Sequence, residues 1–122
     1  MAYVTVTEVK NWSQINYKDL GFTSEADYNS FLEGVIELVE GLIRDYCGRT
    51  WDTVPSAIKF VILEVCANIL HLILQRKITP AVHANQMQLR VVFAEALTAD
   101  LRVILDWHRA LYVSLEEREE EV

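Results

Sequence analysis

The clearest pattern along the chain is a series of hydrophobic residues at three- and four-residue spacing between Ser24 and Gly48. Positions spaced in this way share one face of an α-helix. They are Tyr28, Phe31, Leu32, Val35, Ile36, Val39, Leu42, Ile43 and Tyr46. Ser24 is a favourable N-cap, and Gly48 stands where a helix-ending residue with positive φ is expected. The pattern therefore predicts an amphipathic helix from about residue 25 to residue 47.

The polar positions of this helix fall on its other side. They are Glu33, Glu37, Glu40 and Arg44. Glu and Arg are rarely buried unless they are paired, so we interpret these residues as a solvated helix face.

A second helix is predicted to open at Pro55 and to run to about Arg76. Proline is favourable at a first helical position, because its missing N–H would have no partner there. The stretch from Ala57 to Leu74 is apolar enough to suggest a membrane span. Polar residues interrupt it at Lys59, Glu64, Asn68 and His71. Charges near the centre of a lipid-embedded helix are costly, so we favour a central helix surrounded by neighbours and no membrane.

This helix carries one narrow polar stripe. Its members, at i, i+4, i+7 and i+11, are Glu64, Asn68, His71 and Gln75. On an otherwise buried helix such a stripe faces solvent or a partner subunit, and we propose it as a subunit interface. His71 taken alone is more simply interpreted as a hydrogen-bonded interior histidine than as a metal ligand.

The two ends of the chain carry weaker helical signals. Thr5 and Glu8 have the spacing of a capping box, which predicts a short helix from about Val6 to Gln14. Thr98 caps a last helix from about Asp100 to Leu111, with one apolar face. That face comprises Leu101, Ile104, Leu105, His108 and Leu111.

Two segments lack a clear helical pattern. Pro80 ends the long helix, and the apolar run within residues 78–96 is too short for periodicity to decide, so we expect an extended arm or small hairpin there. Residues 112–122 are acidic, and alone they should fray or be disordered. The fold class is therefore mainly α: a small helical bundle with a long central apolar helix, spanning residues 1–111, followed by a C-terminal acidic tail.

Composition narrows the function. The 122 residues fit one domain, and their net charge is −7 with a pI near 4.9. Domains that grip DNA normally carry a basic patch, and Arg76-Lys77 is the only adjacent basic pair. Specific nucleic-acid binding is disfavoured. We see no secretory signal, and Cys47 and Cys66 fit two reduced, buried thiols in a cytoplasmic protein.

Candidate chemistry is sparse. The chain has no glycine-rich phosphate loop, no HExxH and no Cys/His metal spacing. Asn68 and His71 are the nearest approach to the Glu-x-x-His spacing of di-iron bundles, and Asn is a poor ligand. We therefore expect no catalytic residue, no metal and no cofactor. Trp12, Trp51 and Trp107 suit the core and an interface equally.

Three stretches in order carry a family resemblance. They are VTVTEVKNWSQI, then FLEGVIELVEGLIRDYCGRTWDTVPSAIKFVILEVCANILHLILQRK, then LTADLRVILDWHRA. The resemblance spans about residues 4 to 110, and the order and spacing of the three stretches carry it. The chain resembles the head–tail connector, or adaptor, proteins of long-tailed double-stranded DNA phages.

The resemblance implies a structural virion protein made in the host cytoplasm. Such proteins form a ring, usually a dodecamer, beneath the portal, and further tail or stopper proteins follow. DNA passes through the lumen without specific binding. The C-terminal segment would then contact the portal and neighbouring subunits. The residues concerned are Tyr112, Val113, Leu115, Glu116, Glu117, Glu119, Glu120 and Glu121.

Two other classes remain open from the residues. One is a homodimeric helical regulatory or antitoxin-like protein. The other is a small helical enzyme or ligand-binding bundle. The size of the assembly in solution separates the first from a ring, and a tightly bound small molecule or metal would favour the second.

Overall fold

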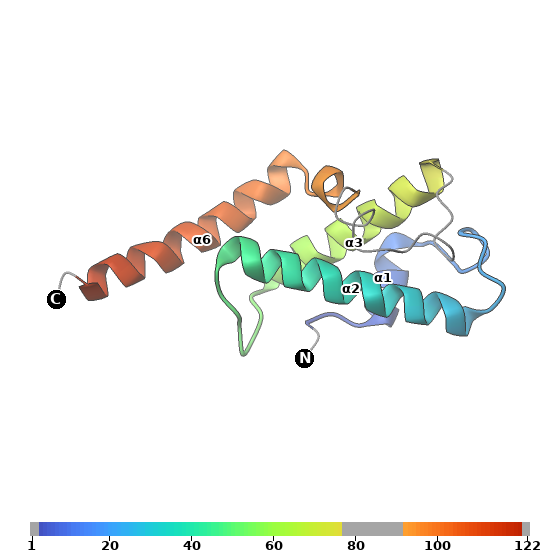
Figure 1. Cartoon of the computed structure of the whole chain (residues 1–122), viewed down its shortest axis with the longest axis horizontal. Helices are drawn as coiled ribbons and strands as arrows, with labels where there is room; N and C mark the ends of the chain where they lie inside the picture. The colour runs from blue at the N-terminus through green and yellow to red at the C-terminus, as the bar shows by residue number, and fades with distance from the viewer. Residues whose placement is uncertain (1–2, 77–91, 121–122) are drawn as a thin grey trace.

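The computed structural model describes the backbone of residues 3–76 and 92–120, and the side chains of residues 3–75 and 92–109. Four helices, α1 (Val6–Ser13), α2 (Glu25–Cys47), α3 (Ser56–Arg76) and α6 (Ala99–Glu120), account for most of it (Figure 1). A further helical turn occupies residues 92–96. Within these ranges there is no strand, so the predicted mainly α fold is confirmed.

The helix caps predicted from the sequence are present in the structure. The Thr5 hydroxyl accepts the N–H of Glu8, while the Glu8 carboxylate accepts the N–H of Thr5, which completes the capping box of α1. The hydroxyl of Ser24 accepts the N–H of Asp27 at 3.2 Å. At the other end of α2, Gly48 has a φ of 70°, and its N–H donates to the Arg44 carbonyl at 2.8 Å. These local bonds set the ends of both helices.

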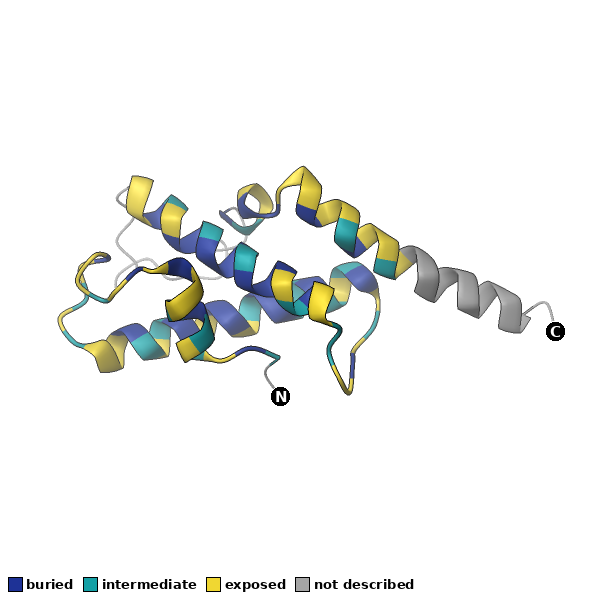
Figure 2. Ribbon diagram, turned by 180° about the vertical axis from the view of Figure 1, so that it is seen from behind, coloured by how far each residue is buried: buried dark blue, intermediate teal, exposed yellow. Residues whose placement is uncertain are grey.

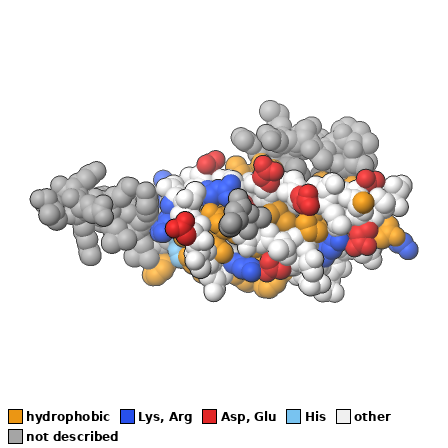
Figure 3. Space-filling view, turned by 90° about the horizontal axis from the view of Figure 1, so that it is seen from below, with side chains coloured by type: hydrophobic (Ala, Val, Ile, Leu, Met, Phe, Trp, Pro, Cys, Tyr) orange, Lys and Arg blue, Asp and Glu red, His pale blue; other side chains and the backbone are white. Residues whose placement is uncertain are grey.

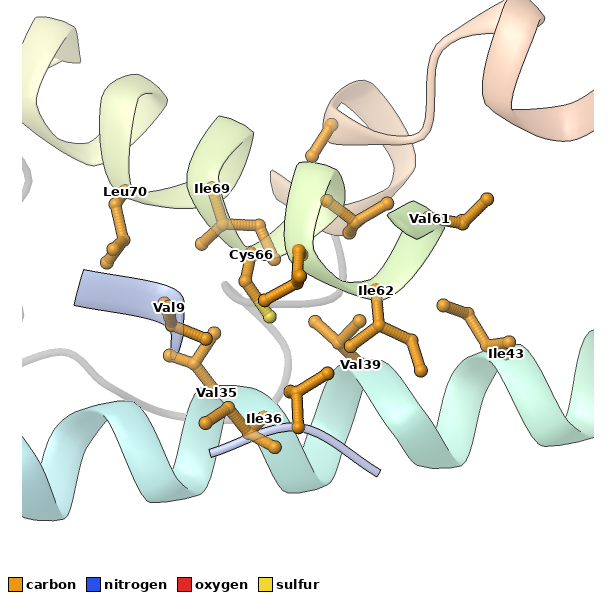
Figure 4. Close-up of a cluster of buried hydrophobic side chains, with 14 of the residues drawn as sticks. Val9, Val35, Ile36, Val39, Ile43, Val61, Ile62, Cys66, Ile69 and Leu70 are labelled. Atoms are coloured by element: carbon orange, nitrogen blue, oxygen red, sulfur yellow. The ribbon is translucent and has the colours of Figure 1, made fainter. Parts of the chain in front are cut away.

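The core lies between α2 and α3, with α1 against one end of the pair (Figure 4). Helix α3 contacts α1, α2 and α6, which explains why it is apolar on most sides. By length and composition alone, Ser56–Gln75 could cross a membrane, and core helices of soluble proteins pass the same test. In this structure 56% of that window is buried, and α3 packs as the central helix of the bundle.

Three boundaries differ from the sequence prediction. Pro55 precedes α3, and its carbonyl accepts the Lys59 N–H at 3.0 Å, so it lies at the cap rather than at the first helical position. Residues 92–96 are helical rather than extended, and the remainder of the predicted arm, residues 78–91, lies outside the described residues. Helix α6 runs on to Glu120 instead of ending near Leu111.

The longer α6 has a physical reason. Leu, Glu and Arg dominate residues 111–120, and all three favour helices. Extending a helix that already exists avoids the cost of nucleation. Most of the predicted acidic tail therefore continues α6 as a helix, which projects from the body of the molecule (Figure 1).

Candidate interaction surfaces

The N-terminal segment is fixed to α2 by a buried carboxylate. The Oε2 atom of Glu40 accepts the backbone N–H groups of Tyr3 at 2.7 Å and of Val4 at 3.0 Å. Glu40 is 2% exposed, so its predicted place on a solvated face is wrong. Burial raises the pKa of this carboxyl, against the opposing effects of its two N–H donors and of Arg44, whose guanidinium lies 4.0 Å away. Glu40 is therefore a structural link between distant parts of the chain.

A groove beside this link has an apolar floor and an acidic edge. It has a volume of about 520 Å³, and we call it the α2 groove. Its lining comprises Val4, Thr5, Val6, Glu33, Ile36, Glu37, Glu40 and Arg44. Glu33 and Glu37 are exposed, as predicted, and neither forms an ion pair with another residue in the described ranges. The groove thus places two solvated carboxylates and the half-buried Arg44 around buried aliphatic side chains.

Helix α6 has apolar residues on two opposite sides. Leu101 and Leu105 are buried against the bundle, as predicted. Val103 and Trp107, one turn apart on the other side, are 67% and 61% exposed. Exposed residues recur along the described part of α6 (Figure 2). Large exposed hydrophobic side chains that adjoin one another commonly mark an interaction site.

Two arginines lie on a different side of α6, the side of Tyr46. Arg102 and Arg109 are both exposed and lie seven positions apart, which places them on the same side of α6. We call Val103 and Trp107, which lie on the opposite side from the buried Leu101 and Leu105, the outer face of α6. Trp and Arg are the residue types most enriched among the energetically dominant residues of protein interfaces.

Contacts with α2 fix the orientation of this face. The Tyr46 hydroxyl donates to the Asp106 carboxylate, and the Arg109 guanidinium lies 5.5 Å from the centre of the Tyr46 ring. The hydrogen bond to Asp106 is the largest cause of a raised pKa at Tyr46. Leu105 adds a buried contact through its carbonyl, 3.9 Å from the Cys47 sulfur. The outer face is therefore held on the side of α6 that points away from the bundle.

The four residues of the polar stripe of α3 fall into two pairs, one bonded within the chain and one exposed. The Glu64 carboxylate accepts the indole N–H of Trp12 at 2.6 Å. The Asn68 amide donates to the Ala96 carbonyl at 3.0 Å. His71 and Gln75 are exposed, so the interpretation of His71 as an interior histidine is wrong. Two of the four proposed interface residues thus already have partners within the chain.

The three tryptophans have different surroundings. Trp51 is 8% exposed and packs edge-on against Tyr3, with ring centres 6.0 Å apart. Trp12 is 43% exposed and lies edge-on to Phe60 at 5.8 Å. Trp107 contacts the ring of its neighbour His108. Sequence alone left core and interface equally open, and the structure assigns Trp51 to the core and the other two to the surface.

The predicted portal-contact residues of the C-terminal segment cannot be placed by their side chains, which lie outside the described residues. Cys47 and Cys66 are buried and free, as predicted. Within the described ranges, no group of three or more His, Cys, Asp or Glu side chains could hold a metal ion. On the face seen in Figure 3, Lys and Arg side chains are interspersed with Asp and Glu.

Comparison with protein-family models, with curated proteins and with solved structures finds no match to this chain. The fold and its surfaces therefore define the class of protein, a small helical bundle with a projecting C-terminal helix.

Proposed function

We propose that this chain is a subunit of a ring-shaped head–tail connector, which lies beneath the portal of a long-tailed DNA phage. The observation that carries the proposal is the projection of α6 from the bundle together with its exposed hydrophobic side chains. The helix leaves the bundle, projects beyond it and exposes Val103 and Trp107 on the side that the bundle does not use (Figure 1). A helix with this form gains contacts when neighbouring subunits or a portal surround it. The sequence resemblance supplies the particular assembly.

Charge supports the proposed passage of DNA. The net charge of −7 disfavours tight binding of a phosphate backbone, because such binding depends on Lys and Arg contacts. A lumen made from acidic subunits repels the duplex and lets it move past. A structural role without catalysis is part of the same proposal.

Native mass spectrometry and electron microscopy of the full chain test the proposal, first alone at high concentration and then with portal rings. We expect a closed high-order ring in at least the second condition. A species that never exceeds a dimer in either condition would contradict the proposal and would favour a homodimeric regulatory protein.

Truncation after Ala110 tests the C-terminal part of α6. The removed residues include the predicted portal contacts from Tyr112 to Glu121. We expect the melting of the bundle to change little, because Leu101 and Leu105 remain in place, while portal binding weakens. Equal portal binding by the truncated and full chains would locate the docking surface elsewhere.

A further inference from the structure

One side of α6 has basic residues beside the bundle and acidic residues beyond it. Five residues follow one another on this side at spacings of seven, four, three and four positions, which keeps them on one side of a helix. The backbone of α6 is helical through all of them. They are Arg102, Arg109, Val113, Glu116 and Glu120, and we call them the charged stripe of α6.

The basic half of the charged stripe lies beside the end of α2. Arg102 and Arg109 are exposed, and neither forms an ion pair with another residue in the described ranges. Both act to lower the pKa of Tyr46, so both lie close to that residue. Asp106 lies between them along the helix, and its carboxylate already accepts the Tyr46 hydroxyl. Two arginines against one bonded carboxylate leave this half positive in a chain whose net charge is −7.

The acidic half of the charged stripe lies near the end of α6. Residues 116–120 comprise four glutamates and one arginine. Glu116 and Glu120 are four positions apart, a spacing at which like charges on a helix repel each other. They also lie near the C-terminal end of α6, where the helix dipole disfavours negative charge. Positive charge from a partner would offset both effects.

A single copy does not bring its own two halves together. Helix α6 is continuous from Ala99 to Glu120 and projects from the body of the molecule (Figure 1). Arg109 and Glu116 are seven positions apart, which is about 10 Å along the helix axis. Ion pairs along one helix form at three- and four-residue spacing instead. The charges that match are therefore available only between copies.

We propose that two copies of this chain pair through antiparallel α6 helices, with the acidic half of each charged stripe against the basic half of the other. A two-fold axis makes every contact twice, because the same surface serves both copies. This pairing goes beyond the proposed function and does not depend on it, since a ring requires a different, head-to-tail contact.

The spacing of the charges fits one register of the pair. With the two-fold axis at residue 112, Glu116 lies one position along the helix from the point opposite Arg109. In the same register Glu120 lies two positions from the point opposite Arg102. These offsets are about 1.5 and 3 Å, which long side chains span. Val113 lies between the two charged pairs and gives the centre of the contact an apolar residue.

Other exposed surfaces select a partner less sharply. The α2 groove has charges of both signs at its edge. The rings of Trp12 and Phe60 already contact each other, and the indole N–H of Trp12 is bonded to Glu64. Neither surface has a matching surface elsewhere on the chain, whereas the two halves of the charged stripe match each other.

Charge reversal in the full chain tests the pairing. One variant has Arg102→Glu and Arg109→Glu, and a second has Glu116→Lys and Glu120→Lys. Sedimentation equilibrium should show a dimer of the wild type that weakens as the ionic strength rises from about 0.05 to about 0.5 M, because salt screens exposed charges. At the lower ionic strength each variant alone should dimerise at least about tenfold more weakly, since every charged pair then joins like charges.

An equal mixture of the two variants should dimerise again. In a mixed pair, each reversed basic half meets a reversed acidic half, and each native half meets a native half. Native mass spectrometry should therefore find mainly the mixed dimer. A single chain with all four reversals should also dimerise like the wild type. Circular dichroism checks that every variant keeps the helical fold.

Two control variants make the same changes in net charge elsewhere. Lys10→Glu with Lys18→Glu matches the first variant at the N-terminal end of α2, and the exposed ion pair of Lys10 with Glu25 that it removes contributes little. Glu33→Lys with Glu37→Lys matches the second variant on an exposed part of α2. Both controls should dimerise like the wild type.

Several outcomes would overturn the pairing. They are a wild type that stays monomeric at low ionic strength, folded reversal variants that dimerise as tightly as the wild type, and a mixture that does not dimerise. Duplex DNA bound through Arg102 and Arg109 in place of a second copy would overturn it as well. Rings that form equally well from the reversal variants would support the connector and contradict the pairing. A charge-dependent dimer that forms no ring with portal would do the reverse.

Discussion

Removal of the Glu40 carboxylate should destabilise the bundle much more than removal of its neighbour Glu37. Glu40 accepts two backbone N–H groups from residues more than 30 positions away, at 2.7 and 3.0 Å. Each buried donor left without a partner costs about 1–3 kcal/mol. Val4 is 1% exposed and should incur most of that cost, whereas the N–H of Tyr3 is only partly buried. Glu40→Ala should therefore cost about 2–4 kcal/mol.

Glu40→Gln separates the hydrogen bonds from the charge. The amide oxygen of Gln can accept the same two N–H groups, so this variant should lie within about 1 kcal/mol of the wild type at pH 7. Burial raises the folded-state pKa of Glu40 above its ordinary value of 4.5. The folded chain then holds this proton more tightly than the unfolded chain. The contribution of Glu40 is thus greatest below pH 4.5 and is lost as the pH rises through the raised pKa.

Urea unfolding followed by circular dichroism, at low protein concentration and at several pH values, measures these free energies. The stability of the wild type relative to Glu40→Gln should fall between pH 4.5 and the raised pKa, because titrations common to both chains cancel. Glu37→Ala is the matched control and should cost less than about 0.5 kcal/mol. Equal costs for Glu40→Ala and Glu37→Ala, or parallel pH profiles for the wild type and Glu40→Gln, would refute the reasoning.

Three further predictions follow from burial and charge. Trp12→Ala should lower the free energy of unfolding in urea by about 1–2 kcal/mol, because the ring contact with Phe60 and the hydrogen bond to Glu64 are lost. Trp107→Ala should lower it by less than about 0.5 kcal/mol, and equal losses would contradict the environments assigned to the two tryptophans. Burial raises the pKa of Cys66 to about 12, so iodoacetamide at about pH 8 should label it only on unfolding, and labelling of the native chain would show an open core. Duplex DNA should show no salt-sensitive binding to the isolated chain in fluorescence anisotropy, and a tight complex that dissociates with salt would overturn the acidic-lumen model.

The parts of the fold that sequence predicts well depend on local interactions. Thr5 with Glu8, Ser24 with Asp27, and Gly48 with Arg44 are each within four residues of one another, and their bonds set the ends of α1 and α2. Such bonds depend on which residue types lie within four positions of one another, so the local sequence is enough to predict them. The apolar spacing of α2 likewise predicted the face that packs in the core, and the apolar composition of α3 predicted its central place.

The errors arise where a distant segment changes the environment of a residue. Glu40 shares a helical face with solvated glutamates, and only the folding back of the N-terminal segment buries it. The missed extension of α6 to Glu120 has a local cause instead: its acidic composition suggested disorder, whereas its residue types favour continuation of an existing helix. Trp12 contacts Phe60 and Glu64 and so joins α1 to α3, and the hydrophobic pattern of neither helix predicts this contact.

The two sides of α6 differ in what a substitution there should affect. Leu101 and Leu105 pack on the bundle, so a change there should lower stability, and any effect on the proposed assembly could not be separated from it. Val103 is 67% exposed and contributes little to the core, so a change there should leave the fold intact. Because hydrophobic periodicity along α6 contains both sets, sequence alone cannot distinguish them. An assembly defect in a normally folded Val103 variant would therefore be direct evidence that the outer face of α6 meets another protein.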